Sequence, residues 1–180
     1  MTICLITKKG SLMNSTIDLL KAHRSIRQFQ NRRIQPDLFE DLIKAGQAAA
    51  SSNFFQAATI IRVTDLQKRA KLASLANNQT YVETAAEFLV FCADMNRAAS
   101  CCDLHGSEAN TGFTEQFIIA TVDAALVAQN IVVASESAGL GICYIGALRN
   151  NPAEVSMVLD LPHDTYPCLL YTSPSPRDRG

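Results

Sequence analysis

The segment His23-Arg24-Ser25-Ile26-Arg27 places two guanidinium groups close together, with an imidazole and a hydroxyl group beside them. Donors crowded onto so short an arc of backbone suit a phosphate bound in bidentate fashion better than a carboxylate. A short basic run at the end of a helix is also typical of a solvated cap on the helix dipole. The segment therefore predicts an anion site, and the rest of the chain decides between these two interpretations.

The size and charge of the chain restrict how such an anion is held. With 180 residues and 48% hydrophobic content, the chain is long enough for one domain with a sizeable core, and we expect a single α/β unit. The 16 Lys and Arg residues against 17 Asp and Glu residues leave a net charge of -1. No global field attracts nucleic acid or an anionic membrane, so we predict neither partner, and the anion must be bound locally.

The six cysteines include no C-x-x-C pair. Cys92 and Cys143 lie inside apolar runs, where free thiols behave as small hydrophobic groups. This pattern favours a reducing, cytoplasmic location over a disulfide scaffold or a zinc site, and we expect no metal. Cys101 and Cys102 lie in a polar stretch, where they are either redox-active or exposed bystanders.

Hydrophobic periodicity divides most of the chain into helices and strands. We expect Glu87 to Ala93, which is apolar on both faces after Glu87, to be central in the sheet. Asn96 to Gly112 shows no clear period and predicts a mobile surface loop. The predicted helices are Ile17 to Ala22, Leu38 to Gly46, Leu66 to Leu75, Phe117 to Ala134 and Ala153 to Leu159, and the predicted strands are Ala58 to Val63, Glu87 to Ala93 and Ile142 to Leu148.

The stretch from Phe117 to Ala134 is the longest apolar run. Its length raises the question of a membrane span, but Asp123, Gln129 and Asn130 inside it make insertion costly. A helix that is apolar on all sides needs cover from more than one direction. We therefore expect a buried helix with part of its cover supplied by a dimer partner.

The two ends of the chain differ from the rest. Met13 precedes a helix start at Ser15 or Thr16, so residues 1–12 are expected to be an upstream extension. From Tyr171 the sequence has no hydrophobic period, and it resembles translated adaptor or vector sequence. We therefore expect one domain over residues 13–167 and a non-native tail over residues 168–180.

Several short motifs, in this order, resemble the flavin-dependent nitroreductases, and in particular their oxygen-insensitive, NADPH-preferring subgroup. The motifs are His23 to Phe29, Ser51 to Gln56, Asn78-Gln79, Phe91 to Asp94, Gly139-Leu140-Gly141 and Tyr144 to Asn151. The resemblance implies an α+β fold, with a central, mostly antiparallel sheet flanked by helices. It also implies an obligate homodimer with one FMN per subunit at the interface. Members of the family continue beyond the position of Pro167, so the chain is expected to be truncated at its C-terminus.

The resemblance also implies roles for residues near the N-terminus. His23, Arg24 and Ser25 would hold the FMN phosphate and ribityl chain, and Arg27 would face the polar edge of the ring. A fixed cation near a reduced flavin stabilises its negative charge, in agreement with this role. The alternative for Arg27 is a surface ion pair, with Asp37 or Glu40.

Three further segments match flavin-contacting parts of the family. Ser51, Ser52 and Asn53 match a loop that reaches the flavin, and Gln79 matches a residue that hydrogen-bonds the ring. The backbone of Tyr144, Ile145, Gly146 and Ala147 matches the segment beside the ring, with Ala147 where the family's nearest members carry glycine. Read without the resemblance, these segments are a helix-to-strand connector, a loop and a buried strand.

The function implied is that of an FMN-dependent NAD(P)H oxidoreductase. No catalytic side chain is expected, because in flavin chemistry the cofactor carries the hydride. NADPH or NADH would reduce the flavin and leave, and nitroaromatics, quinones or similar small, flat aromatic acceptors would then be reduced by two electrons in ping-pong fashion. One alternative is an NADPH-flavin reductase that supplies reduced FMN. Another is a non-catalytic fragment that binds a phosphate or nucleotide.

Overall fold

The computed structural model describes residues 15–30 and 33–173, so the predicted extension over residues 1–12 lies outside the described residues. Its centre is a four-stranded sheet in the order β1-β2-β4-β3, in which all three neighbouring pairs are antiparallel. This pairing confirms the α+β class and corrects the α/β unit expected from composition. The strands are β1 (Ala58–Arg62), β2 (Glu87–Asp94), β3 (Cys143–Ile145) and β4 (Thr165–Ser173).

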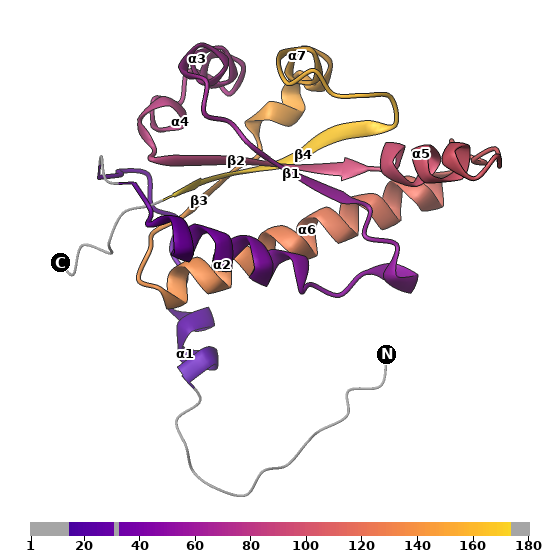
Figure 1. Ribbon diagram of the computed structural model, residues 1–180. Coiled ribbons are helices and arrows are strands. Elements are labelled where there is room, and N and C mark those ends of the chain that lie inside the picture. The colour runs from indigo at the N-terminus through magenta and orange to yellow at the C-terminus, as the bar shows by residue number, and fades with distance from the viewer. Residues whose placement is uncertain (1–14, 31–32, 174–180) are drawn as a thin grey trace, which may run out of the picture.

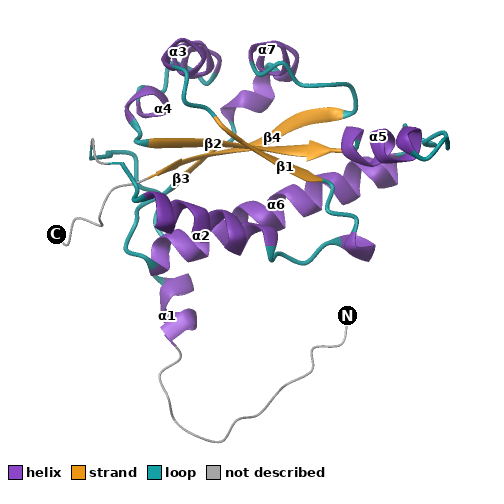
Figure 2. Cartoon of the chain, viewed as in Figure 1, coloured by secondary structure: helices purple, strands orange, loops and turns teal. Residues whose placement is uncertain are grey.

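Helices cover both faces of the sheet (Figure 1). One face carries α3 (Leu66–Leu75), α4 (Tyr81–Thr84) and α7 (Pro152–Val158), and the other carries α2 (Pro36–Gln47) and α6 (Thr114–Ser137). Figure 2 shows α1 (Ser15–Lys21) beneath the layer of α2 and α6, and α5 (Asn96–Leu104) at one end of the sheet. Every residue of β2 is buried between the two layers, as its apolar sequence predicts.

The α6 helix packs on the sheet with one side only. Ala124, Ala128 and Ile131 are fully buried there, whereas Ile118, Val122 and Leu126 are 53%, 49% and 40% exposed. By length and composition α6 is apolar enough to cross a membrane, the only such helix in the described part of the chain. Its buried side also carries the carboxylates of Asp123 and Glu136. We call Ile118, Val122 and Leu126 the α6 stripe.

The predicted loop from Asn96 to Gly112 is wrong in its first half, because Asn96–Leu104 forms α5. The backbone N–H of Arg97 donates to Asp94 Oδ1 at 3.1 Å, so the last residue of β2 helps to cap the helix. Ala98, Ala99 and Cys102 are half-buried at helical spacing. The small size of these side chains hides the amphipathic pattern from a search for large apolar residues.

Strand β4 runs across the predicted domain boundary at Pro167 to Ser173, and it pairs with both β2 and β3. A strand between two neighbours is held by its backbone hydrogen bonds, which require no hydrophobic period. The register shifts between Phe91 and Cys92, which face Leu169 and Pro167. This bulge accommodates a proline in a central strand. Whether residues 168–180 are native remains a prediction.

The predicted third strand, Ile142 to Leu148, is shorter in the structure. Strand β3 ends at Ile145, and Gly146 adopts helical backbone angles of φ -90° and ψ -14°. The chain then forms a 3₁₀ turn, η2 (Ala147–Asn150), before α7. The conformation of Gly146 turns the chain out of the sheet and so sets the end of the strand.

The thiol of Cys92 lies in β2 with no exposed surface, and burial raises its pKa to about 12. The unfolded chain therefore loses this proton first as the pH rises above about 9, so this group's contribution to stability falls from there up to about pH 12. At pH 8.5, iodoacetamide should alkylate exposed Cys101 and leave Cys92 unmodified until the protein unfolds. Mass spectrometry of tryptic peptides measures both rates. Equal rates in the folded protein would contradict the buried position of β2.

Candidate functional site

The basic segment runs beside the start of β3. Ile26 N donates to Ile142 O at 2.7 Å, and Ser25 forms a parallel bridge with Ile142. A Cβ on Gly141 would lie 2.9 Å from Ile26 Cγ1, so only glycine leaves room for the segment at that position. The backbone is thereby fixed, while the side chains of Arg24, Ser25 and Arg27 stay exposed.

His23 is oriented by a buried carboxylate in the last turns of α6. Its Nδ1 lies 2.9 Å from Glu136 Oε1, and the Glu136 side chain is only 3% exposed. An Nδ1–H that donates to Glu136 leaves Nε2 free to face a ligand. Sequence analysis did not identify Glu136 as part of the site.

Arg27 and Gln79 both lie close to the hydroxyl group of Tyr81. Burial raises the pKa of the Tyr81 hydroxyl, and the nearby Arg27 guanidinium counteracts part of this effect. The same hydroxyl donates to Gln79 Oε1 at 2.5 Å. Neither alternative ion pair of Arg27, with Asp37 or with Glu40, is formed within the described residues, and Glu40 pairs with Lys44 at 2.7 Å. Burial also raises the pKa of the Cys143 thiol, again opposed by Arg27, so Arg27 lies close to β3 as well.

The segment at the end of β3 lies next to this group. Tyr144 and Gly146 are half-buried, and Ile145 is buried. A Cβ on Gly146 would lie 2.8 Å from Arg149 Nη2, so the space that a side chain would take is filled by Arg149. Arg149 Nη1 in turn donates to Cys168 O at the bulge of β4, at 3.0 Å. Within one chain, the close contact that Gly146 permits is therefore with Arg149.

Ser51, Ser52 and Asn53 lie elsewhere, beside the first half of α6. Ser51 Oγ donates to Asp123 Oδ2 at 2.7 Å, whereas His23 is bound to Glu136, more than three turns further along the same helix. At a rise of ~1.5 Å per residue, the two anchoring carboxylates are about 20 Å apart along the axis. The structure therefore brings together the basic segment, Gln79 and the end of β3, and it leaves residues 51–53 apart from them.

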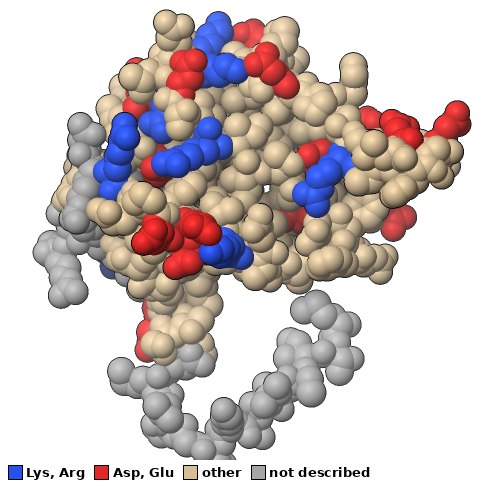
Figure 3. All heavy atoms as spheres, viewed as in Figure 1, with Lys and Arg blue, Asp and Glu red and all other residues tan. Residues whose placement is uncertain are grey.

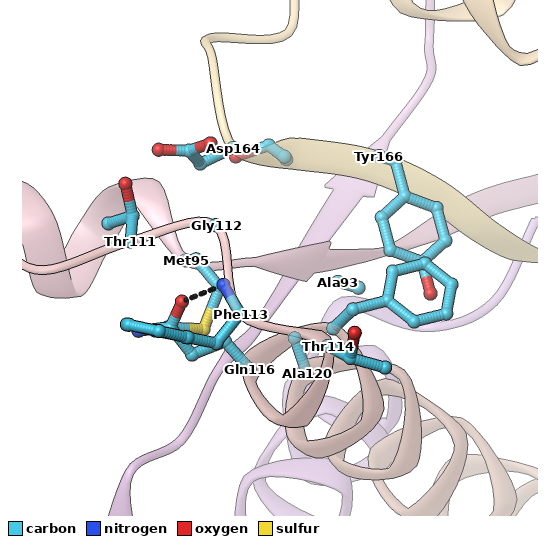
Figure 4. A pocket seen from close by; sticks show the side chains of 12 residues that line it. Ala93, Met95, Thr111, Gly112, Phe113, Thr114, Gln116, Ala120, Asp164 and Tyr166 are labelled. Atoms are coloured by element: carbon cyan, nitrogen blue, oxygen red, sulfur yellow. Dashed lines mark hydrogen bonds between the residues drawn. The ribbon is translucent and has the colours of Figure 1, made fainter.

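A cavity of about 470 Å³ opens at the start of α6, and sequence analysis did not predict it (Figure 4). Phe113, Phe117 and Tyr166 line it, and the rings of the last two stack with centroids 5.1 Å apart. Asp164 lies at its rim in Figure 4. Its walls come from β2, the residues before α6 and the start of β4, and segments so distant in sequence leave no local signal.

Neither the surface charge nor a cluster of metal-binding side chains identifies a further site in the described part of the chain. On the face shown in Figure 3, Lys and Arg alternate with Asp and Glu, without a patch of one sign. Within residues 15–30 and 33–173, no three His, Cys, Asp or Glu side chains gather in a way that could hold a metal ion. The exposed cations of the basic segment remain the clearest anion-binding group.

Comparison with known proteins gives one consistent result. A family model described as "Nitroreductase family" matches residues 20–172. The chain is 47% identical over 153 residues to an NADPH-flavin oxidoreductase of Vibrio harveyi, and the match covers 85% of this chain and 62% of that protein. It is 41% identical over 168 residues to an oxygen-insensitive NADPH nitroreductase of Salmonella typhimurium, covering 91% and 68% of the two chains.

A solved structure of nitroreductase A from Vibrio parahaemolyticus is similar with a TM-score of 0.87 and 45% sequence identity, and the match covers 92% of this chain and 69% of that one. The chain spans a little under two thirds of the length of the Vibrio harveyi protein and of an FMN reductase (NADPH) of Bacillus subtilis, at 62% and 63%.

Proposed function

This chain belongs to the nitroreductase family, and from this premise we propose that it forms the core of an FMN-dependent NAD(P)H oxidoreductase. Bound FMN would supply the redox chemistry, which is acceptance of a hydride from NADPH or NADH and two-electron reduction of a nitroaromatic, a quinone or a similar flat acceptor. The observation that carries the proposal is the basic segment, whose backbone is fixed against Ile142 while its donors stay exposed.

The donors of this segment fit a phosphate monoester. Arg24 supplies a fork of N–H groups with no ion pair among the described residues, and Ser25 adds a hydroxyl. His23 is held by Glu136 through Nδ1, and its Nε2 bonds to none of the described residues. Arg27 lies beside Tyr81, where its charge can face the polar edge of a flavin ring. We assign the phosphate to the first three residues and the ring edge to Arg27.

The remaining proposed contacts follow from the same placement. Gln79 accepts from Tyr81 through Oε1, which leaves its amide N–H groups for the ring. The backbone of Tyr144, Ile145, Gly146 and Ala147 lies next to this group, beyond the bridge of Ser25 to Ile142. No side chain of this set needs to act as nucleophile or metal ligand.

We also propose that the functional unit is a homodimer whose two copies meet through the α6 stripe. An exposed apolar row on a soluble helix marks an interaction site. The α1 helix lies against α6 and exposes Ile17 and Leu20 as well. In a two-fold dimer, residues 51–53 of one copy can approach the basic segment of the other, which the separation of about 20 Å prevents within one chain. Both predicted groups can then contact one flavin.

The relatives' names favour a second candidate function within the same chemistry. Two of them are named as an NADPH-flavin oxidoreductase and an FMN reductase, and such an enzyme supplies reduced FMN to another protein. Exchange of bound FMN with added labelled flavin during turnover distinguishes the two functions. Rapid exchange supports the flavin reductase, and retention supports direct reduction of the acceptor. The five described free cysteines support a reducing, cytoplasmic location for either.

The first experiment is reconstitution of the purified chain with FMN. We expect a yellow protein whose flavin colour bleaches under anaerobic conditions with NADPH or NADH and returns on addition of a quinone. Gel filtration removes unbound FMN before the spectrum is recorded, so the remaining colour comes from flavin bound to the protein. A colourless protein after reconstitution would contradict the proposal and favour a phosphate-binding fragment without redox chemistry.

A further inference from the structure

Asp123 is a buried carboxylate in the middle of an apolar helix. It is only 2% exposed, and it forms no ion pair with a described Lys, Arg or His residue. A buried carboxylate is costly unless hydrogen bonds compensate for the lost water. Three donors do so: Ser51 Oγ at 2.7 Å, Ser52 N at 3.4 Å and Ala57 N at 3.0 Å. All three come from the loop between α2 and β1.

These bonds close the loop at both ends. Ser51 Oγ donates to Asp123 and accepts from Gln56 N at 2.6 Å. The N–H of Ala57, one residue further, donates to the same carboxylate oxygen as Ser51. A single side chain of α6 therefore fixes the start and the end of residues 51–57.

The backbone between these anchors is strained. Asn53, Phe54 and Gln56 have φ values of 49°, 58° and 54°. The left-handed conformation costs non-glycine residues roughly 1 kcal/mol or more each, somewhat less for Asn. Such a conformation persists only where its surroundings fix it. Backbone bonds hold part of this loop, with Phe55 N donating to Ser52 O and Asp94 N donating to Ala57 O, and the side chains of Asp123 and Ser51 join its two ends.

Two side chains of the loop take no part in the hydrogen bonds that hold it. Ser52 and Asn53 are exposed, and their side chains form no hydrogen bond with the rest of the described chain. Ser51, in contrast, commits its only hydroxyl proton to Asp123. The three residues thus divide into one that holds the loop and two that face outward.

We propose that Asp123 is a positioning residue for FMN binding: through Ser51 it holds the strained loop in the conformation that offers Ser52 and Asn53 to the flavin. The inference rests on the proposed function. A preorganised loop avoids the ordering cost that binding would otherwise carry. Loss of the anchor should therefore weaken FMN affinity even where the fold survives.

The test compares Asp123→Asn with the wild type. The amide keeps the size of the side chain and replaces one acceptor oxygen with a donor. Since Ser52 N and Ala57 N donate to different oxygens of Asp123, the NH2 group opposes one of these two N–H groups in either orientation of the amide. We expect the dissociation constant for FMN, measured by quenching of flavin fluorescence, to rise at least about tenfold, as expected for a loss of ~1.4 kcal/mol. The visible spectrum of the FMN that remains bound should shift toward that of free flavin.

Asp94→Asn is the matched control. Asp94 is also buried, and its side chain accepts from three donors outside residues 51–57: Thr59 Oγ1, Thr165 Oγ1 and Arg97 N. Its backbone N–H, which donates to Ala57 O at 3.0 Å, is unchanged by the substitution. This variant should lower the melting temperature of the apoprotein while FMN affinity and spectrum stay within about twofold of the wild type. Ser51→Ala should reproduce the Asp123→Asn effect, the double variant should add little to it, and Ser51→Thr, which keeps the hydroxyl, should restore affinity.

The outcomes distinguish failure of the proposed function from failure of the positioning role of Asp123. A wild type that does not bind FMN overturns the proposed function. A wild type that binds FMN, with Asp123→Asn and Ser51→Ala binding equally well, overturns the positioning role alone. Equal loss of affinity in Asp94→Asn also overturns it, because general destabilisation would then explain the effect. If Asp123→Asn does not fold, the comparison of Ser51→Ala with Ser51→Thr decides.

Discussion

Replacing Leu126 with arginine is expected to convert the proposed dimer into monomers and to abolish FMN retention. Leu126 is the last member of the α6 stripe and is 40% exposed in the single chain. In a two-fold interface each substitution occurs twice, so two guanidinium groups would be placed in an apolar contact. An unpaired buried charge costs about 3–5 kcal/mol, so the dimerisation constant should weaken by more than about a hundredfold. Light scattering after gel filtration measures the mass.

The control for Leu126→Arg is Leu104→Arg. Leu104 is 84% exposed at the end of α5, away from the α6 stripe, and the substitution adds the same charge. This variant should remain dimeric and keep its flavin. If Leu126→Arg stays dimeric, the two copies meet elsewhere. If it becomes monomeric and still retains FMN, residues 51–53 of a second copy are not needed for the site.

Much of the fold follows from the sequence because burial leaves a periodic trace. The apolar run of β2 and the stretch that became α6 were predicted with small errors at their ends. The failures have physical reasons. The inward side of α5 carries small, half-buried residues, and β4 is held by backbone pairing on both sides. Neither property produces a strong hydrophobic pattern in the sequence.

The candidate site was predicted less completely, because sequence motifs indicate ligand contacts better than the groups behind them. In the sequence, Asp123 served only as an argument against a membrane span, and no part in the site was predicted for Glu136. In the structure, each buried carboxylate fixes one of the segments predicted to contact FMN. A carboxylate within an apolar helix was the available signal, since burial without partners is costly.

Replacing Arg24 with glutamine is expected to weaken FMN binding by about ten- to a hundredfold, since a hydrogen bond to a charged group contributes roughly 1.5–3 kcal/mol. Arg24 is exposed beside the bridge of Ser25 to Ile142, so the substitution should leave the fold intact. Isothermal titration of the apoprotein with FMN measures the effect. The wild-type affinity should also fall as salt is added, and the variant should show a smaller dependence.

Riboflavin separates a phosphate contact from a general effect of Arg24→Gln on the site, because it carries the same ring without the phosphate. If Arg24 binds the phosphate, Arg24→Gln should lose affinity for FMN and keep its affinity for riboflavin. The preference for FMN should then fall by about the same factor without vanishing, because His23 and Ser25 still contact the phosphate. Lys71→Gln removes an exposed cation on α3, on the opposite face of the sheet from α6, and should keep the preference. If Arg24→Gln lost affinity for FMN and riboflavin equally, Arg24 would contact the flavin ring or support the protein backbone of the site. Another cation would then have to bind the phosphate.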